Sequence, residues 1–155
     1  MKTNYIVIPV ITLLTATFGG YLTDQGLAGW YQSINLPAWT PTGGFIGLVW
    51  TIIFLLSTIS ALIVWNSGEM GKRLWNIGLF FIINAFLNIF WVYLFFFKNM
   101  IGTAFLEAIL LEISVLVLIV LIWPISKKAS VLLWPYAGWV AFATYLTYVI
   151  QTLNQ

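Results

Sequence analysis

The sequence carries very little charge. Only 6% of its 155 residues are Asp, Glu, Lys or Arg, whereas soluble domains carry about 25%. So few charged side chains cannot cover a surface that faces water, and a hydrophobic fraction of 62% excludes intrinsic disorder. The composition therefore predicts an integral membrane protein, and the length predicts a single domain over residues 1–155.

Cysteine and histidine are both absent. Without cysteine the chain has no disulfide and no thiolate, and without histidine it lacks the commonest metal ligand, so we expect no metal site. The net charge of +2 is too small for a nucleic-acid groove, and we expect no nucleic-acid partner. Aromatic residues are abundant instead, and the nine Trp are the first positive indication of function.

Five segments are long and apolar enough to cross a bilayer, which takes about 20 residues of helix. Nearly all charged residues fall between these segments or at their ends, and only Glu107 and Glu112 fall inside one. The sequence therefore predicts an all-α membrane protein, a bundle of five transmembrane helices with a long structured first loop. The predicted spans are about 5–22, 45–65, 74–97, 101–123 and 131–153.

The first span begins after Lys2 and has two readings, a signal peptide or a helix of the bundle. Small residues recur at Thr12, Ala16 and Gly20 on one face, and at Thr15 and Gly19 on the next. Such spacing allows helices to approach closely. We therefore favour a helix that packs in the bundle.

The Lys and Arg residues are divided unequally between the two sides of the predicted bundle. The side with the N-terminus holds five of them (Lys2, Lys72, Arg73, Lys127 and Lys128), and the other side holds Lys98 alone. Cytoplasmic loops carry the excess of Lys and Arg. We therefore expect a cytoplasmic N-terminus, with the first loop and the C-terminus outside.

The segment 23–44 is the longest predicted connection, and it is aromatic rather than polar. It contains Trp30, Tyr31, Trp39 and two prolines, of which Pro41 restricts the backbone close to the second span. One reading is a lid that folds over the mouth of the bundle. The other is an interfacial belt of Trp and Tyr. We favour the lid, and the two roles are compatible.

Some aromatic and polar residues lie too deep in their spans to belong to an interfacial belt. They follow helical spacing, which puts them on single faces. An amide in contact with lipid is costly, so the Asn side chains should point inward, either to bond neighbouring helices or to orient a ligand; the pattern favours neither. The stripes are Trp50 and Phe54; Asn84, Asn88, Trp91 and Phe95; and Trp139, Phe142, Ala143 and Leu146.

Glu107 and Glu112 lie on different faces of the fourth span. An ionisable side chain at bilayer depth is a candidate functional group. Glu112 is also consistent with a protonated carboxyl group or with a subunit contact. A proton-coupled transporter would need such a carboxylate.

Several short motifs occur in a familiar order. Gly29-Trp30-Tyr31, Leu36 to Pro41 and Val49-Trp50-Thr51 resemble the first loop and second helix of the translocator protein family (TspO/MBR, tryptophan-rich sensory protein or peripheral benzodiazepine receptor). Leu87-Asn88 with Trp91 and Phe95-Phe96 resembles its third helix. Trp134-Pro135-Tyr136, Trp139 and Ala141 to Thr144 resemble its fifth. The resemblance runs from Gly29 to Tyr148.

This resemblance implies a five-helix bundle, commonly a homodimer, with a pocket that opens toward the first loop. It implies binding of porphyrins such as protoporphyrin IX and of isoquinoline and benzodiazepine ligands, with no required cofactor. Carried over by position, the ligand-binding residues are Tyr31, Trp39, Pro41, Trp50, Phe54, Asn84, Asn88, Trp91, Trp139, Phe142 and Ala143.

The chain departs from the family pattern at two places. Thr42 stands where the family usually has a second proline after Pro41. The animal cholesterol motif needs a basic residue after Tyr148, and none follows it, so cholesterol transport is not expected. The short tail resembles bacterial members, which places the protein in a bacterial cell membrane.

The resemblance leaves three functions open: a porphyrin-binding receptor or sensor, a transporter of porphyrin or another apolar solute, and a membrane scaffold regulated by ligand. We favour the first.

Iron ligation suits this chain poorly, since Tyr and Met are the remaining axial ligands, so the ligand should be a metal-free porphyrin. The family also suggests light- and oxygen-dependent porphyrin degradation, for which Trp50 and Trp139 are the candidate catalytic residues. Whether the protein is an enzyme stays open.

Overall fold

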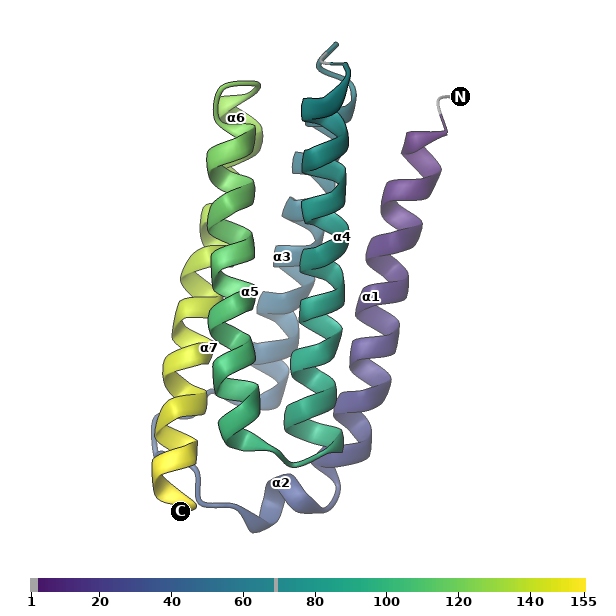
Figure 1. The fold of residues 1–155 in the computed structure, drawn as a ribbon. Coiled ribbons are helices and arrows are strands. Elements are labelled where there is room, and N and C mark those ends of the chain that lie inside the picture. Colours follow the sequence, from purple (N-terminus) through teal and green to yellow (C-terminus); the bar gives the residue numbers. More distant parts are fainter. Residues whose placement is uncertain (1–2, 69) are drawn as a thin grey trace.

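The computed structural model describes residues 3–68 and 70–155, and the regular secondary structure in these residues is helical (Figure 1). Five helical segments are long and apolar enough to cross a membrane, which confirms the predicted fold class. Lys2 and Glu69 lie outside the described residues. The elements are α1 (Asn4–Leu27), α2 (Trp30–Ser33), α3 (Gly43–Trp65), α4 (Lys72–Val92), the π-helix η1 (Tyr93–Phe97), α5 (Ile101–Ile122), α6 (Lys127–Val131) and α7 (Trp134–Leu153).

The long helices form a closed ring. α5 packs against α4 on one side and α7 on the other, while α1 packs against α3 and α4. α3 closes the ring through α6 and α7. In Figure 1, α1 stands apart from α4 near the N-terminus and meets it at the opposite end, where α2 lies beneath the bundle.

The α1 helix is longer than predicted and ends at Leu27 rather than near Leu22. Its buried residues are Thr15, Gly19, Leu22 and Gly26, which follow one helical face. Burial therefore continues past Leu22 and extends the helix into the segment predicted as loop. Gly26 makes the closest approach, because a Cβ atom there would lie 2.5 Å from the carbonyl oxygen of Phe96.

The fifth span is divided rather than continuous. α6 ends at Val131, and α7 begins at Trp134 with a proline in its first turn. Proline lacks an N–H donor and suits the start of a helix, so Pro135 marks the place where the helix restarts. The Ser60 hydroxyl donates to the Ala129 carbonyl at 2.8 Å, which attaches α6 to α3.

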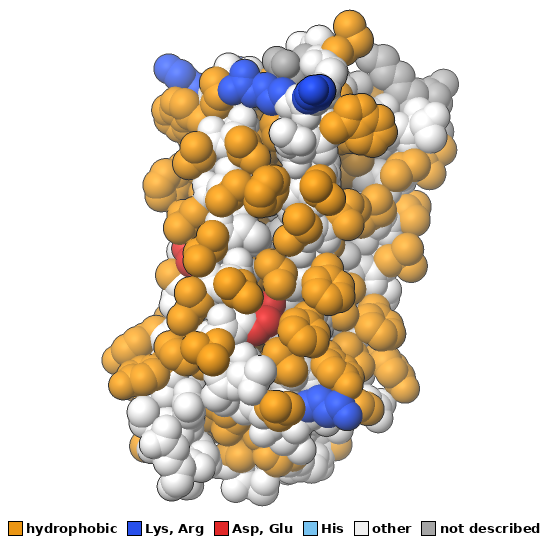
Figure 2. Space-filling model, in the orientation of Figure 1, with side chains coloured by type: hydrophobic (Ala, Val, Ile, Leu, Met, Phe, Trp, Pro, Cys, Tyr) orange, Lys and Arg blue, Asp and Glu red, His pale blue; other side chains and the backbone are white. Residues whose placement is uncertain are grey.

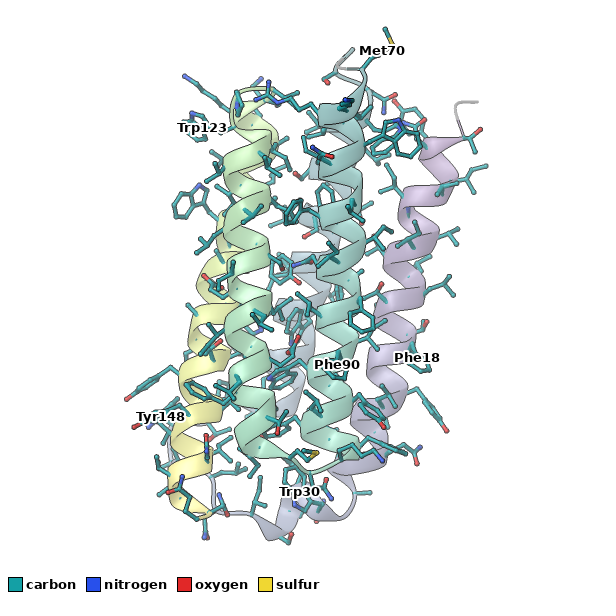
Figure 3. All side chains as sticks on the ribbon, in the orientation of Figure 1. Phe18, Trp30, Met70, Phe90, Trp123 and Tyr148 are labelled. Carbon is teal, nitrogen blue, oxygen red and sulfur yellow. The ribbon has the colours of Figure 1, made fainter. Side chains whose placement is uncertain are left out.

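The charged side chains divide along the long axis of the molecule. Lys and Arg side chains gather at the end of the bundle where α1 begins and α6 lies, and further basic atoms lie near the α2 end (Figure 2). Trp123 projects outward at the α6 end (Figure 3), as expected for a residue at the membrane interface. The bundle between these ends is covered by exposed apolar side chains, which fits an integral membrane protein.

Candidate functional site

The segment after α1 covers one end of the bundle. Trp30 lies under the helix ends (Figure 3), with its ring 5.4 Å from that of Phe95 in an edge-on arrangement. Tyr31 contacts Phe95 and Phe96, with ring centroids 6.2 and 5.5 Å apart. Both Phe residues belong to η1, whose wider turn adds a residue to the helix. The lid therefore rests on the π-helix.

Hydrogen bonds attach the far side of the lid to α7. The Asn154 side chain accepts from the Asn35 backbone N–H at 2.8 Å and donates to the Asn35 carbonyl at 2.9 Å. These paired bonds hold the segment between α2 and α3 against the end of α7. Thr42, where the family has proline, caps α3 by accepting a hydrogen bond from the Phe45 N–H at 3.4 Å.

Beside this attachment, an aromatic cluster joins the lid to α3 and α7. Trp39 stacks on Tyr145 at 5.8 Å and meets Phe142 edge-on at 6.0 Å. Trp139 contacts Phe142 at 5.3 Å and Phe45 at 6.2 Å. The Trp139 Nε1 is buried and has no hydrogen-bond partner within the described part of the chain. The cluster thus offers flat apolar walls and one available donor.

A second aromatic cluster lies across the bundle on α4 and η1. Trp91 stacks on Phe95 at 5.1 Å, and its Nε1 is also buried without a partner among the residues described here. Tyr31 joins this cluster from the lid, and burial raises the pKa of its hydroxyl above the ordinary value. A tyrosine hydroxyl is protonated at neutral pH even without this shift, so Tyr31 can donate a hydrogen bond.

Asn84 and Asn88 take part in an interhelical hydrogen-bond network. Asn84 donates to the Ser114 hydroxyl at 2.8 Å and accepts from the Tyr136 hydroxyl at 2.9 Å. Asn88 donates to the same Tyr136 hydroxyl at 3.1 Å. The network joins α4, α5 and α7, so both Asn side chains point inward and bond neighbouring helices.

Trp50 lies next to this network. Its ring meets Tyr136 edge-on at 6.0 Å and Phe54 at 5.6 Å. Trp50 and Trp139 both pack against the same buried cluster, and their contacts reach it from α3 and α7. The two candidate catalytic residues are thus on neighbouring helices, with Tyr136 beside one and Phe142 beside the other.

A cavity extends away from the lid. It has a volume of about 540 Å³ and lies between α1, α3 and α4, from Thr3 at one end to Asn88 and Tyr136 at the other. Of the predicted ligand-binding residues, Phe54, Asn84 and Asn88 line it. Five others belong to the two aromatic clusters, namely Tyr31, Trp39, Trp91, Trp139 and Phe142, and Pro41 lies in the lid. Trp50 contacts Phe54 and Tyr136 beside the cavity, and Ala143 lies on α7. The structure therefore divides the predicted set between two regions.

Sequence reasoning missed Tyr136 and Ser114 as members of the polar network. Tyr136 is only 3% exposed, and its ring separates Trp50 from the two Asn side chains. A signal was present, because a serine or tyrosine hydroxyl inside a span needs a partner just as an amide does. On the α1 side of the cavity the same signal was present in Thr12 and Thr15, which we interpreted as small residues for helix packing.

Glu107 lies inside the bundle, and its side chain is 4% exposed. Both of its carboxyl oxygens, and one oxygen of Glu112, are buried without a hydrogen-bond partner in residues 3–68 and 70–155. Both residues belong to α5, which packs between α4 and α7. These carboxyl groups are ionisable, and they take no part in the hydrogen bonds described above.

The fold and these regions define a membrane protein of five helices, with an aromatic lid over one end and a polar network at mid-depth. Comparison with known proteins agrees. The sequence matches the TspO/MBR family over residues 6–153, and the chain belongs to this family.

Three relatives illustrate how far the similarity extends. The uncharacterized membrane protein YtaB of Bacillus subtilis is 38% identical over 149 residues, which cover 94% of this chain and 92% of the relative. The tryptophan-rich protein TspO of Bacillus cereus is 35% identical over 126 residues, 81% of this chain and 80% of the relative. That of Archaeoglobus fulgidus is 33% identical over 153 residues, 96% of both chains.

Proposed function

We propose that this protein is a membrane receptor that binds porphyrins, protoporphyrin IX in particular, in the aromatic region beneath the lid. The same region would accept benzodiazepine and isoquinoline ligands. We further propose that the protein is a homodimer in a bacterial cell membrane, with its lysine-rich end in the cytoplasm. Family membership supports a sensor or translocator role in the membrane. That the ligand is a porphyrin is our own proposal.

The observation that carries the proposal is the pair of buried indole donors. Trp91 and Trp139 each have an Nε1 without a partner within the described residues, and each ring lies in an aromatic cluster that the lid contacts. A flat apolar ligand with a few polar atoms suits such walls. The lid residues Tyr31 and Trp39 would then cover the ligand on the side that faces water.

We also propose that Trp50 and Trp139 take part in light-dependent degradation of bound porphyrin, with dissolved dioxygen as the oxidant. Both are half-buried, and indole is an easily oxidised side chain that can exchange an electron with an excited porphyrin. The proposal therefore separates two roles, since binding depends on the whole aromatic region whereas degradation depends on these two rings.

The test is the decay of the porphyrin Soret band in light and in dark with purified protein. We expect decay only in light and only with protein. The double variant Trp50→Phe/Trp139→Phe should still bind porphyrin, but the Soret band should decay at least about tenfold more slowly under the same illumination. The matched control is Trp123→Phe/Trp134→Phe, since both rings are exposed at the opposite end. Decay at the parent rate in the first variant would refute the catalytic role.

A second candidate function is transport of an apolar solute. The observation that favours it is Glu107, a buried carboxyl group without a partner in the described part of the chain. Ionisable groups at this depth serve as proton carriers in transporters. Flux into liposomes that stops in Glu107→Gln, with porphyrin binding intact, would support transport over reception.

A further inference from the structure

The cavity between α1, α3 and α4 is shaped differently from a site for a flat macrocycle. On α1 its lining runs from Thr3 to Thr15, and on α4 from Trp75 to Asn88. At about 1.5 Å per helical residue these stretches span roughly 18 to 20 Å. The volume of about 540 Å³ is within the range of small-molecule sites. The cavity is therefore long and narrow, and it follows the helix axes.

The cavity opens to the lipid-facing surface near the N-terminal end of the bundle. Its lining includes Val7 of α1 and Leu79 and Ile82 of α4, which are 46%, 57% and 50% exposed. The buried residues of α1 all lie at Thr15 or beyond, so the first half of this helix is more open, and a hydrogen bond between the Thr12 and Thr58 hydroxyls at 2.8 Å attaches it to α3. A ligand could thus enter sideways from the leaflet at the lysine-rich end.

The walls between the two ends of the cavity are mostly apolar, but they include the hydroxyl groups of Thr12, Ser57 and Thr58. The Ser57 Oγ is buried without a partner in the described residues, and the mouth of the cavity carries a further donor. Asn4 lines the cavity at the N-terminal end, and its Nδ2 is buried without a partner in the part of the chain that is described. Lys72 begins the helical stripe that continues through Trp75 and Leu79, because positions i, i+3 and i+7 share a face. Lys72 is exposed. Lys72 does not line the cavity itself; it lies about one helical turn before Trp75, just beyond the end of the cavity at which Asn4 lies.

From this arrangement we propose that the cavity is a binding site for a long-chain fatty acid taken from the surrounding leaflet. The acyl chain lies along the apolar stretch between α1 and α4, and the carboxylate accepts hydrogen bonds from Asn4 and pairs with Lys72. A carboxylate satisfies the buried Asn4 donor, which an alkane would leave unpaired. This site shares Phe54, Asn84 and Asn88 with the predicted ligand-binding set, but its acyl chain and carboxylate contacts lie toward the lysine-rich end and do not depend on porphyrin binding.

The proposal is tested by binding of radiolabelled oleate to the purified full chain in detergent micelles. We expect saturable binding of one oleate per chain. Lys72→Gln should weaken it roughly threefold, as expected for loss of one exposed ion pair. Arg73→Gln is the matched control, because it removes a neighbouring cation from the other face of α4, and it should bind as the parent does. Equal weakening in both variants would mean that bulk charge attracts the ligand, and would overturn the proposal.

Variants that fill the cavity test the location. Ala61→Phe places a ring inside the cavity and should reduce binding by about tenfold or more. Ala85→Leu adds a smaller side chain at another position of the cavity lining. Its oleate binding is measured if Ala61→Phe does not elute from size-exclusion chromatography as a folded protein. Ala141→Phe, on an exposed face of α7, is the control and should bind normally. Normal oleate binding in a folded cavity variant would overturn the proposal.

Competition identifies the ligand class. Unlabelled oleate should displace the label, whereas oleyl alcohol, with the same chain and no charge, should displace it much less well. If the alcohol competes equally, the site recognises only the acyl chain, and the proposed contacts to the carboxylate are wrong. If dioleoylphosphatidylglycerol competes as well as oleate, a two-chain membrane lipid is the occupant and the fatty-acid proposal fails.

Discussion

At the scale of single residues, Tyr136 connects three helices of the bundle. Its hydroxyl group donates to Asn84 and accepts from Asn88, and its ring meets Trp50. The residue therefore joins α7 to α4 by hydrogen bonds and to α3 by ring contact. Unpaired polar groups are costly away from water, which makes this hydroxyl a good position to test the network.

We predict that Tyr136→Phe lowers the stability of the protein by about 1 to 2 kcal/mol, because two amide groups lose their shared partner while the ring is kept. The measurement is thermal unfolding in detergent, followed by circular dichroism. Tyr148→Phe is the control, since Tyr148 is 48% exposed. This variant should unfold at the same temperature as the parent protein. An unchanged unfolding temperature for Tyr136→Phe would show that the network contributes little.

For the two Asn side chains, the sequence predicted correctly that they point into the bundle, but it did not predict which residues they bond. The cost of an unpaired amide in hydrocarbon was enough to predict that Asn84 and Asn88 point inward. Their partners Ser114 and Tyr136 lie on other helices, 30 to 52 positions away along the chain. Such pairs depend on how the helices are arranged, which the spacing along one helix does not determine.

At the scale of elements, the buried residues of α1 lie along its second half, and the first half is attached to α3 by the hydrogen bond between the Thr12 and Thr58 hydroxyls at 2.8 Å. Gly26 approaches η1 so closely that a Cβ atom would lie 2.9 Å from the Cβ of Phe96. Toward its N-terminus the helix borders the cavity instead. The contact at Gly26 therefore holds the second half of α1 against η1.

We predict that Gly26→Val destabilises the protein by about 1 to 3 kcal/mol, because the side chain has no room against η1. Thermal unfolding in detergent gives the value. Gly20→Ala is the matched control in the same helix. A Cβ atom there meets nothing within 4 Å, and alanine favours helix over glycine by about 0.5 to 1 kcal/mol. If both variants unfold alike, the close contact does not hold α1.

Element boundaries were predicted well where composition alone determines them. The spans follow from apolar length, so α3 and α5 begin and end within two residues of the predicted limits. The extension of α1 to Leu27, the π-helix at Tyr93–Phe97 and the break between α6 and α7 were not predicted. The first two depend on packing between α1, the lid and α4, and hence on tertiary contacts.

At the scale of the whole molecule, two regions share one bundle. The aromatic clusters lie at the lid end, and the long cavity extends from mid-depth to the lysine-rich end. The polar network of Asn84, Asn88 and Tyr136 lies between them. The sequence resemblance predicted a single pocket that opens toward the first loop, and it could not locate the cavity, which depends on how α1 leans against its neighbours.

The central claim is that porphyrin binds at a defined site in this bundle. The most direct measurement is a titration of protoporphyrin IX into the purified protein in the dark, following the Soret band and Trp fluorescence. We predict a shifted Soret band and Trp quenching that saturate together at one porphyrin per chain. Linear, non-saturating changes equal to those of empty detergent micelles would contradict the claim, because they would show partition into the apolar phase and no site.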